Sequence, residues 1–156
     1  LTYSGMLDNK NVTFFPSYGA EMRGGTANCS VVVSTEEVAS PVVAHPSTLI
    51  AMNEPSLVSF EPNIEEGGLL FVNSSLITVK PQRSDIEIVN VPANDIAAAV
   101  GSPKSANMVM VGAFCKKTGA VALESVFAAL PKVFTKANAE LIQKNIEALK
   151  KGAESC

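Results

Sequence analysis

The sequence contains no tryptophan, one histidine and three cysteines, and charged residues make up only 17% of its 156 positions. Because His45 has no second imidazole to join, a multi-histidine metal site is excluded, and we interpret it as a loop or surface residue. Cys29, Cys115 and Cys156 are scattered, which excludes a disulfide framework and a C-x-x-C site for zinc or an iron–sulfur cluster. A reducing, cytoplasmic compartment is therefore expected.

The sequence also lacks a basic cluster and a long apolar run. Twelve basic residues stand against fifteen acidic ones, a net charge of −3, so the electrostatic pattern of a nucleic-acid-binding or membrane-surface protein is missing. Apolar stretches such as Met108 to Cys115 are far shorter than the roughly 18 residues of a membrane span, and no signal-peptide pattern is present. The 47% hydrophobic content excludes a disordered chain and favours one domain over residues 1–156 that buries more than its own core, as a subunit does.

Short hydrophobic runs alternate with helical patterns along the chain. Strands are expected at residues 11–16, 29–34, 48–53, 69–73 and 86–91. The first four runs are continuously apolar, which is typical of strands covered on both faces, whereas residues 86–91 alternate and are expected nearer an edge. Helices are expected at residues 55–60, 92–100, 107–117 and 123–130. These patterns predict a three-layer α/β domain with a mostly parallel central sheet.

Both ends of the chain show helical patterns. Residues 1–6 indicate the end of a helix, so we expect residues before Leu1 to be missing from this chain. The last helix is expected between Thr135, a suitable N-cap, and Gly152, a suitable C′ residue. Its apolar stripe consists of Leu141, Ile142, Ile146 and Leu149. Its expected i,i+4 ion pairs are Glu140–Lys144 and Glu147–Lys151.

Polar residues follow several of the expected strands, where open α/β sheets gather ligands. Asn53 ends one strand, and Asn73, Ser74 and Ser75 end another. Small polar side chains at these places can hold a ligand, but Asn and Ser are also preferred helix N-caps. We favour capping for Asn53 and Ser74 and keep ligand binding as the alternative.

The densest group of unusual residues lies between Ser17 and Asn28. Its other members of interest are Tyr18, Gly19, Glu21, Met22, Arg23, Gly24 and Gly25. The glycines permit close backbone approach, and Arg23 offers a planar fork for carboxylate or phosphate. No Lys-Ser/Thr follows the glycines, so a Walker phosphate loop is excluded. On composition alone we favour a tight turn with a surface ion pair, and a phosphate- or partner-binding loop is the alternative.

No set of residues in the sequence supplies a nucleophile, a base and an orienting group. The serines at the expected strand ends have no candidate base except His45, and no two carboxylates stand at a spacing that joins them on one element. From its residues, the chain is an α/β domain with incomplete catalytic machinery.

The segment SYGAEMRGGTANCSVVVS, residues 17–34, resembles the gamma subunit of the 2-oxoacid:ferredoxin (acceptor) oxidoreductase family. The resemblance continues in order in SPVVAHPSTLIAMN, GGLLFVNSSLI, NVPANDIAAAVG and ANMVMVGAF, so it covers nearly the whole chain. The Gly-rich G-x-G-G-Q-G loop that usually opens this family is absent here. Residues 1–6 would correspond to the end of the helix that follows that loop, and no function of the loop is carried over.

The resemblance implies a Rossmann-like domain in a multi-subunit enzyme. Such enzymes oxidatively decarboxylate a 2-oxo acid, transfer the acyl group to coenzyme A and reduce ferredoxin. This chain is then expected to bind no cofactor itself, with thiamine diphosphate, Mg and 4Fe–4S clusters held by alpha, beta and, in some complexes, delta subunits. No nucleic acid and no membrane is expected as a partner. Met22 between Glu21 and Arg23 resembles the 2-oxoglutarate or branched-chain enzymes more than the pyruvate enzymes.

Our leading hypothesis places the loop from Ser17 to Asn28 at an intersubunit face, where it orders the walls of the active site. Arg23 would contact either Glu21 or a partner subunit. A stand-alone nucleotide- or coenzyme-A-binding module, which would use the glycine amides and the turn at residues 73–75, remains open. A non-catalytic scaffold is the third possibility.

Overall fold

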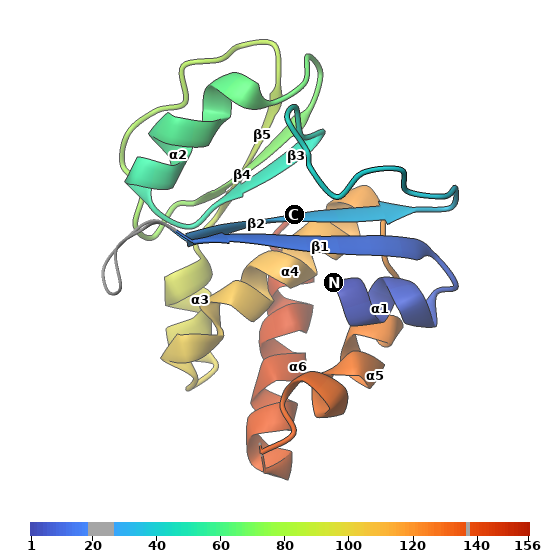
Figure 1. Cartoon of the computed structure of the whole chain (residues 1–156). Coiled ribbons are helices and arrows are strands. Elements are labelled where there is room, and N and C mark those ends of the chain that lie inside the picture. The colour runs from blue at the N-terminus through green and yellow to red at the C-terminus, as the bar shows by residue number, and fades with distance from the viewer. Residues whose placement is uncertain (19–26, 137) are drawn as a thin grey trace.

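The computed structural model describes residues 1–18, 27–136 and 138–156 (Figure 1). Its centre is a parallel sheet formed by β3 (Thr48–Ala51), β4 (Leu69–Asn73) and β5 (Glu87–Val91), in that spatial order. Ala51 pairs with Val72 and Val72 with Asn90, so the strands end together at one carboxyl edge. β5 lies at the side of the sheet, as the alternating pattern of residues 86–91 predicts.

Helical layers cover both faces of this sheet. On one face, α2 (Glu54–Phe60) and the 3-10 turn η1 (Glu61–Asn63) pack over the buried side chains of Leu70 and Val72. On the other face, Phe71 packs against small residues of three later helices. Neighbouring residues of β4 point to opposite faces, and both faces are buried, so its continuously apolar sequence is explained. The predicted three-layer α/β fold with a parallel central sheet is confirmed.

The helices that follow β5 are α3 (Ala93–Ala99), η2 (Pro103–Ser105), α4 (Ala106–Thr118), α5 (Leu123–Val133) and α6 (Ala139–Glu154). α4 ends at Gly119, whose φ of +62° is a left-handed conformation that favours glycine. The expected end of α5 before Pro131 is wrong. Leu130 is buried and its carbonyl accepts a hydrogen bond from the N–H of Phe134, which holds the last turn together past the proline. Among the described residues, no helix is long and apolar enough to span a membrane.

The two ends of α6 differ from the sequence prediction. Asn138, rather than Thr135, caps the helix, because its Oδ1 accepts a hydrogen bond from the N–H of Leu141 at 2.9 Å. Gly152 lies inside the helix and not at C′. A Cβ atom at Gly152 would stand 1.9 Å from the carbonyl oxygen of Val109 in α4. This glycine is therefore required by close helix packing and not by the end of the helix.

The side chains of α6 only partly follow the expected pattern. Leu149 is fully buried, but Leu141 is 40% exposed, so the apolar stripe is wrong at that position. The buried line consists of Asn145, Ala148, Leu149 and Gly152. The Glu140–Lys144 pair is confirmed at 2.8 Å, whereas Lys151 pairs with Glu154 instead of Glu147.

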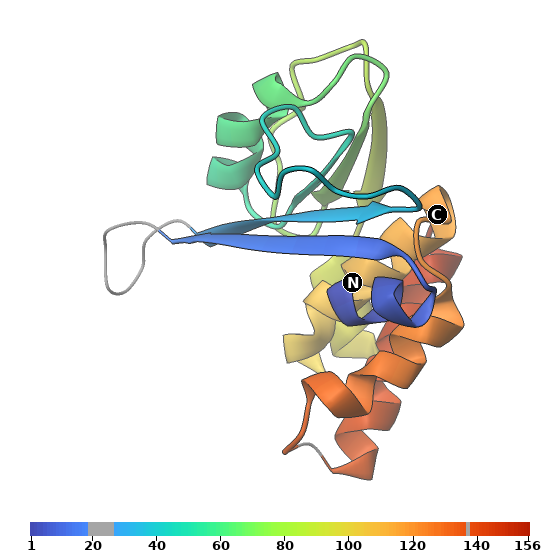
Figure 2. The ribbon, with the colours of Figure 1, turned by 45° about the vertical axis from the view of Figure 1, so that its right-hand side comes forward.

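The N-terminal part of the chain forms a separate antiparallel ribbon. β1 (Asn11–Tyr18) pairs with β2 (Ala27–Ser34), and the ribbon crosses the molecule between the parallel sheet and the helical half (Figures 1 and 2). α1 (Thr2–Leu7), the expected N-terminal helix, packs on its base, where a Cβ at Gly5 would stand 2.6 Å from Val12 Cγ1. The expectation that these two strands are covered on both faces is wrong. Phe14 is 54% exposed and Phe15 is 45% exposed, because the ribbon lies outside the central sheet.

Candidate functional site

The loop predicted to carry function begins and ends on the ribbon. Ser17 pairs with Asn28, and Tyr18 pairs with Ala27, in the last described rungs of the β1–β2 ladder. The remaining candidates, Gly19, Glu21, Met22, Arg23, Gly24 and Gly25, lie outside the described residues. The ladder therefore brings the two flanks of the loop together, and the Glu21–Arg23 ion pair stays a prediction.

The second candidate region is the carboxyl edge of the parallel sheet. Asn53 follows β3, and its Oδ1 accepts a hydrogen bond from the N–H of Ser56 at 3.0 Å, so it caps α2 as predicted. Glu54 in the first turn of α2 adds a favourable interaction with the helix dipole. The side-chain oxygen of Asn53 is thus engaged by its own helix.

Asn73, at the end of β4, is the buried centre of this edge. Its side chain is fully inaccessible, and its Nδ2 donates to the carbonyl of Met52 at 3.2 Å and to Oδ1 of Asn94 at 2.8 Å. These bonds tie β4 to the segment after β3 and to the first turn of α3. Within the described part of the chain, the Oδ1 of Asn73 has no hydrogen-bond partner. Asn73 is therefore a structural connector of three segments with one unsatisfied acceptor.

Ser74 and Ser75 form a turn next to this connector. The expected capping role of Ser74 is wrong, because residues 74–76 form a turn in which the N–H groups of Leu76 and Ile77 both bond to the carbonyl of Asn73. Ser75 instead links the turn to α3. Its hydroxyl donates to Oδ2 of Asp95 at 2.8 Å and accepts from the N–H of Asp95 at 3.2 Å.

The chemical capacity of the described residues is limited. His45 is exposed in the irregular segment before β3, as predicted. Burial raises the pKa of the Cys115 thiol to about 11, so this cysteine is protonated and unreactive at neutral pH. No group of three His, Cys, Asp or Glu residues in the described ranges could hold a metal ion. At the carboxyl edge, the described side chains of Asn53, Asn73 and Ser75 form hydrogen bonds to neighbouring segments.

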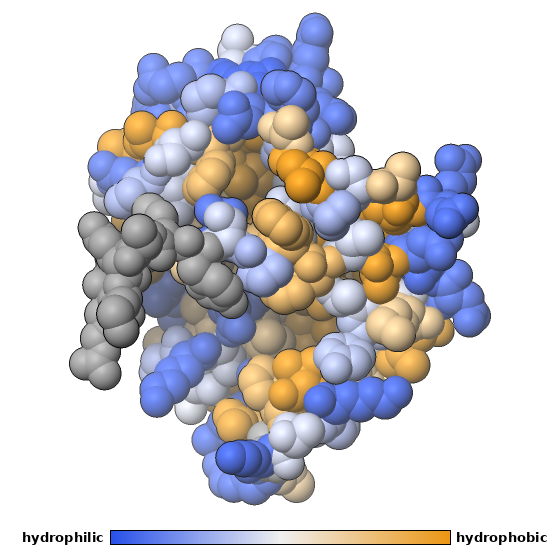
Figure 3. Space-filling view, in the orientation of Figure 1, coloured by the Kyte–Doolittle hydropathy of each residue, from blue (hydrophilic) through white to orange (hydrophobic). Residues whose placement is uncertain are grey.

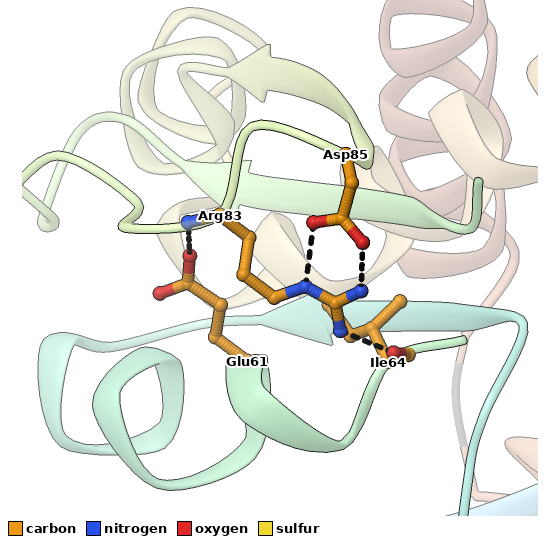
Figure 4. Close-up of polar contacts among 4 residues, drawn as sticks. All are labelled: Glu61, Ile64, Arg83 and Asp85. Carbon is orange, nitrogen blue, oxygen red and sulfur yellow. Dashed lines mark hydrogen bonds and ion pairs between the residues drawn. The ribbon is translucent and has the colours of Figure 1, made fainter. Parts of the chain in front are cut away.

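One polar network was missed by the sequence analysis (Figure 4). Glu61 is buried, and its Oε1 accepts hydrogen bonds from the backbone N–H groups of Gln82 and Arg83 at 2.5 and 2.7 Å. The Arg83 guanidinium grips both carboxylate oxygens of Asp85 and also donates to the carbonyl of Ile64. The hydrogen bond from Arg83 lowers the pKa of Asp85. The R-x-D spacing of Arg83 and Asp85 was the sequence signal for this ion pair, but it does not indicate the distant partner Glu61.

The Glu61 network holds the irregular crossing between two strands of the sheet. Residues 74–86 join β4 to β5 without a helix; Glu61 accepts from backbone N–H groups of this segment, and Arg83 within it donates to the carbonyl of Ile64. Because an irregular segment has few internal backbone hydrogen bonds, these side chains replace them. The network therefore fixes the segment that leads from the carboxyl edge of β4.

Comparison with known proteins decides the family. The model of the pyruvate ferredoxin/flavodoxin oxidoreductase family matches residues 1–155. The chain belongs to this family. The resemblance derived from the sequence motifs is confirmed at this level, and the described fold matches solved members of the family.

Several family members give the scale of the similarity. The chain is 34% identical over 155 residues to ketoisovalerate oxidoreductase subunit VorA of Methanothermobacter thermautotrophicus, covering 99% of this chain and 32% of that protein. It is 33% identical to the 2-oxoglutarate synthase subunit KorC of Methanocaldococcus jannaschii, covering 96% of this chain and 79% of KorC. The chain thus spans about a third of VorA but most of KorC.

A solved structure of the family supports the fold. The gamma subunit of a keto/oxoacid ferredoxin oxidoreductase from Geobacter sulfurreducens PCA superposes with a TM-score of 0.78 at 27% identity. The match covers 99% of this chain and 85% of that subunit. The superposition therefore includes both the separate ribbon and the three-layer body of this chain.

Proposed function

We propose that this chain is the gamma-type part of a 2-oxoacid:ferredoxin oxidoreductase. The whole enzyme would oxidatively decarboxylate a 2-oxo acid, join the acyl group to coenzyme A and pass two electrons to ferredoxin. The observation that carries the proposal is the family match over residues 1–155, together with a KorC relative that the chain covers over 79% of its length. The relatives named for 2-oxoglutarate and ketoisovalerate favour one of these two substrate classes.

In this proposal the chain supports catalysis without performing it. Among the described residues no group of three His, Cys, Asp or Glu side chains could ligate a 4Fe–4S cluster, and we propose no site in this chain for thiamine diphosphate or its magnesium ion. Those groups would be held by the alpha and beta subunits, with a delta subunit in some complexes. The loop between Ser17 and Asn28 would contribute to assembly and to one wall of the active site.

The direct test is reconstitution with and without this chain. The alpha and beta subunits are co-expressed with the chain, and coenzyme-A-dependent ferredoxin reduction is measured with 2-oxoglutarate, ketoisovalerate and pyruvate. We expect turnover only in the complete complex, with 2-oxoglutarate or ketoisovalerate preferred. Turnover by the isolated chain, or full turnover by the other subunits without it, would overturn the proposal.

A single variant tests the proposed part played by the loop. If the Arg23 guanidinium makes a buried charge-assisted contact, removing it in Arg23→Ala costs about 3–5 kcal/mol of assembly energy. Arg23→Lys keeps the charge but not the planar fork and should be intermediate. Unchanged assembly and unchanged turnover in Arg23→Ala would contradict the proposed contribution of Arg23 to assembly and catalysis.

A further inference from the structure

A groove of about 560 Å³ lies between α2 and the irregular crossing from β4 to β5. Its apolar walls are formed by Leu57, Val58, Pro62 and Val79. Val58 is 65% exposed and Val79 is 39% exposed, so the groove is open to solvent. In Figure 3, an apolar patch interrupts the hydrophilic surface over α2. The groove therefore presents apolar surface that the described part of the chain leaves uncovered.

A buried carboxylate faces this groove. Glu61 lines it and is only 4% exposed. Its Oε1 accepts from the N–H groups of Gln82 and Arg83, but no hydrogen bond or ion pair within the described ranges reaches its Oε2. Oε2 points away from the Arg83 guanidinium (Figure 4). It also reaches the surface, since Thr13 Oγ1 and Asn73 Oδ1 are the described side-chain atoms that are enclosed without a partner. The groove thus contains a carboxylate oxygen that can accept further hydrogen bonds.

The charges around the groove favour a cation in it. Residues 35–92, which include the parallel sheet and α2, carry eight acidic and two basic residues. Both basic residues line the groove, but the Arg83 guanidinium is already bound to Asp85. Lys80 forms no ion pair with Glu61 in the part of the chain that the structure describes. Because a buried carboxylate gains most from a charge-assisted hydrogen bond, a cationic group suits the open oxygen of Glu61.

We propose that the groove receives the side chain of a lysine or arginine from a partner protein. The aliphatic stem of either residue packs along the apolar walls, while its cationic head donates to Glu61 Oε2. The open shape favours a side chain that projects from a protein surface, because a site for a free small molecule encloses most of its ligand. The partners that the proposed function supplies are the alpha and beta subunits. The identity of the partner therefore rests on that function, whereas the chemistry of the groove does not.

The chemistry of the groove is tested by NMR titration of the chain. The probe is N-acetyl-arginine N-methylamide, and the corresponding norleucine derivative is its uncharged counterpart. The backbone amide signals of Gln82 and Arg83, whose N–H groups bond to Glu61, report on the carboxylate. We expect saturable shifts with the arginine probe and about tenfold weaker binding of the norleucine probe. Equal binding of the two probes, or no binding of either, would overturn the cation site.

Two glutamine variants separate a direct contact from the general negative field. Glu61→Gln keeps an acceptor for the Gln82 and Arg83 N–H groups but removes the charge, so the affinity for the arginine probe should fall about tenfold. Glu65→Gln makes the same change of charge at an exposed position that does not line the groove, and should alter the affinity by about twofold at most. Val58→Ser, on the exposed wall, should weaken both probes. Equal losses in the two glutamine variants would show that net charge alone attracts the probe, against the proposed contact.

The partner is tested in the complex assembled with the alpha and beta subunits. Val58→Cys, in a Cys29→Ser and Cys156→Ser background, places an accessible thiol on the groove wall while Cys115 stays buried. Assembly should slow maleimide labelling of this thiol by about tenfold or more, and adding Glu61→Gln should restore much of the rate. Labelling at the same rate in the isolated chain and in the complex would refute the partner assignment, while the complex and the proposed function stand. If no complex forms, the proposed function fails and the partner assignment fails with it, and the probe titration alone decides the chemistry of the groove.

Discussion

Gly112 and Gly152 allow α4 and α6 to touch backbone to backbone. A Cβ built on Gly112 would stand 1.9 Å from the carbonyl oxygen of Leu149, and one on Gly152 would stand 1.9 Å from that of Val109. Ordinary van der Waals contact begins near 3.4 Å. Gly112→Ala would therefore push the two helices apart by about 1.5 Å, which is the difference between these two distances.

The free energy of this substitution combines two opposing effects. Overpacking costs about 1–3 kcal/mol, and we expect the upper end because the obstructing atom belongs to a helix backbone and cannot rotate away. Alanine in place of glycine inside a helix returns about 1 kcal/mol of helix propensity. Gly112→Ala is thus expected to lower the free energy of unfolding by about 2 kcal/mol. For a chain of this size, that corresponds to a fall in Tm of about 4–8 °C.

A comparison with Gly119 distinguishes lack of space from backbone strain. Gly119 has a φ of +62° and nothing within 4 Å of its would-be Cβ, so Gly119→Ala pays only for the left-handed conformation. Asparagine tolerates that conformation better than alanine, so Gly119→Asn should be the milder of the two variants there. At Gly112, the Gly112→Asn variant should be less stable than Gly112→Ala, because the asparagine side chain is larger.

Urea unfolding of the Ala and Asn variants at Gly112 and at Gly119, followed by far-UV circular dichroism, measures the order of stability at each position. Helix propensity acting alone predicts that Gly112→Ala stabilises the chain. A Gly112→Ala variant as stable as the parent, or the same order at both positions, would refute the close-packing argument.

Four further outcomes are expected from the described contacts. Asp8→Ala should cost about 1 kcal/mol at pH 7, because the Asp8 carboxylate caps the start of α5 through the Ala122 N–H at 2.7 Å and the Ser125 hydroxyl. Those hydrogen bonds lower the pKa of Asp8, so its contribution is complete above the unfolded-state pKa and is lost as the pH falls through the folded-state value; the gap between parent and variant in denaturation curves should therefore close in acid. Glu61→Ala should cost about 1–3 kcal/mol by leaving the Gln82 and Arg83 N–H groups without their acceptor, and Glu61→Gln, which keeps an oxygen, should cost less in the same urea titration. Asn73→Asp should destabilise the chain at pH 7 by placing a carboxylate against the Met52 carbonyl and Asn94 Oδ1, with stability recovering as the pH is lowered; equal destabilisation at every pH would contradict this reasoning. At pH 8 a thiol reagent should modify Cys29 in the native chain and leave Cys115 intact until the chain unfolds, because the Cys115 thiol is buried and its pKa is about 11.

The parallel sheet and its helices could be predicted because their signals are local. The run Leu69–Val72 is apolar along its whole length, and Asn53 stands directly before a helix that it caps. The sequence also indicated that β5 lies near an edge, because residues 86–91 alternate between apolar and polar more than the other strand runs do. In each case the determining interaction lies within the element or next to it in the chain.

The errors arise where a residue's role depends on a distant contact. Gly152 looks like a helix-ending glycine in the sequence. The structure requires a glycine there because the carbonyl of Val109, 43 positions earlier in the sequence, leaves no space for a Cβ atom. Glu61 is an ordinary acid in the sequence, and only the fold brings it to the backbone of residues 82 and 83. The two ribbon strands contain apolar runs, Phe14–Phe15 and Val31–Val33, and the sequence alone does not say whether such a run is covered by its own chain. Tertiary partners decide these cases.

The two candidate regions differ in what they can offer a partner. Asn73 is the most unusual polar residue of the carboxyl edge, yet it is fully inaccessible, so a ligand could reach its unsatisfied Oδ1 only by opening the edge. Opening would break the bonds to Met52 and Asn94, which join three segments of the body. The ribbon requires no such rearrangement, since its aromatic rings already lie half in solvent on opposite faces. Of the two candidate regions, the ribbon is therefore the one that a partner can reach without rearrangement of the chain.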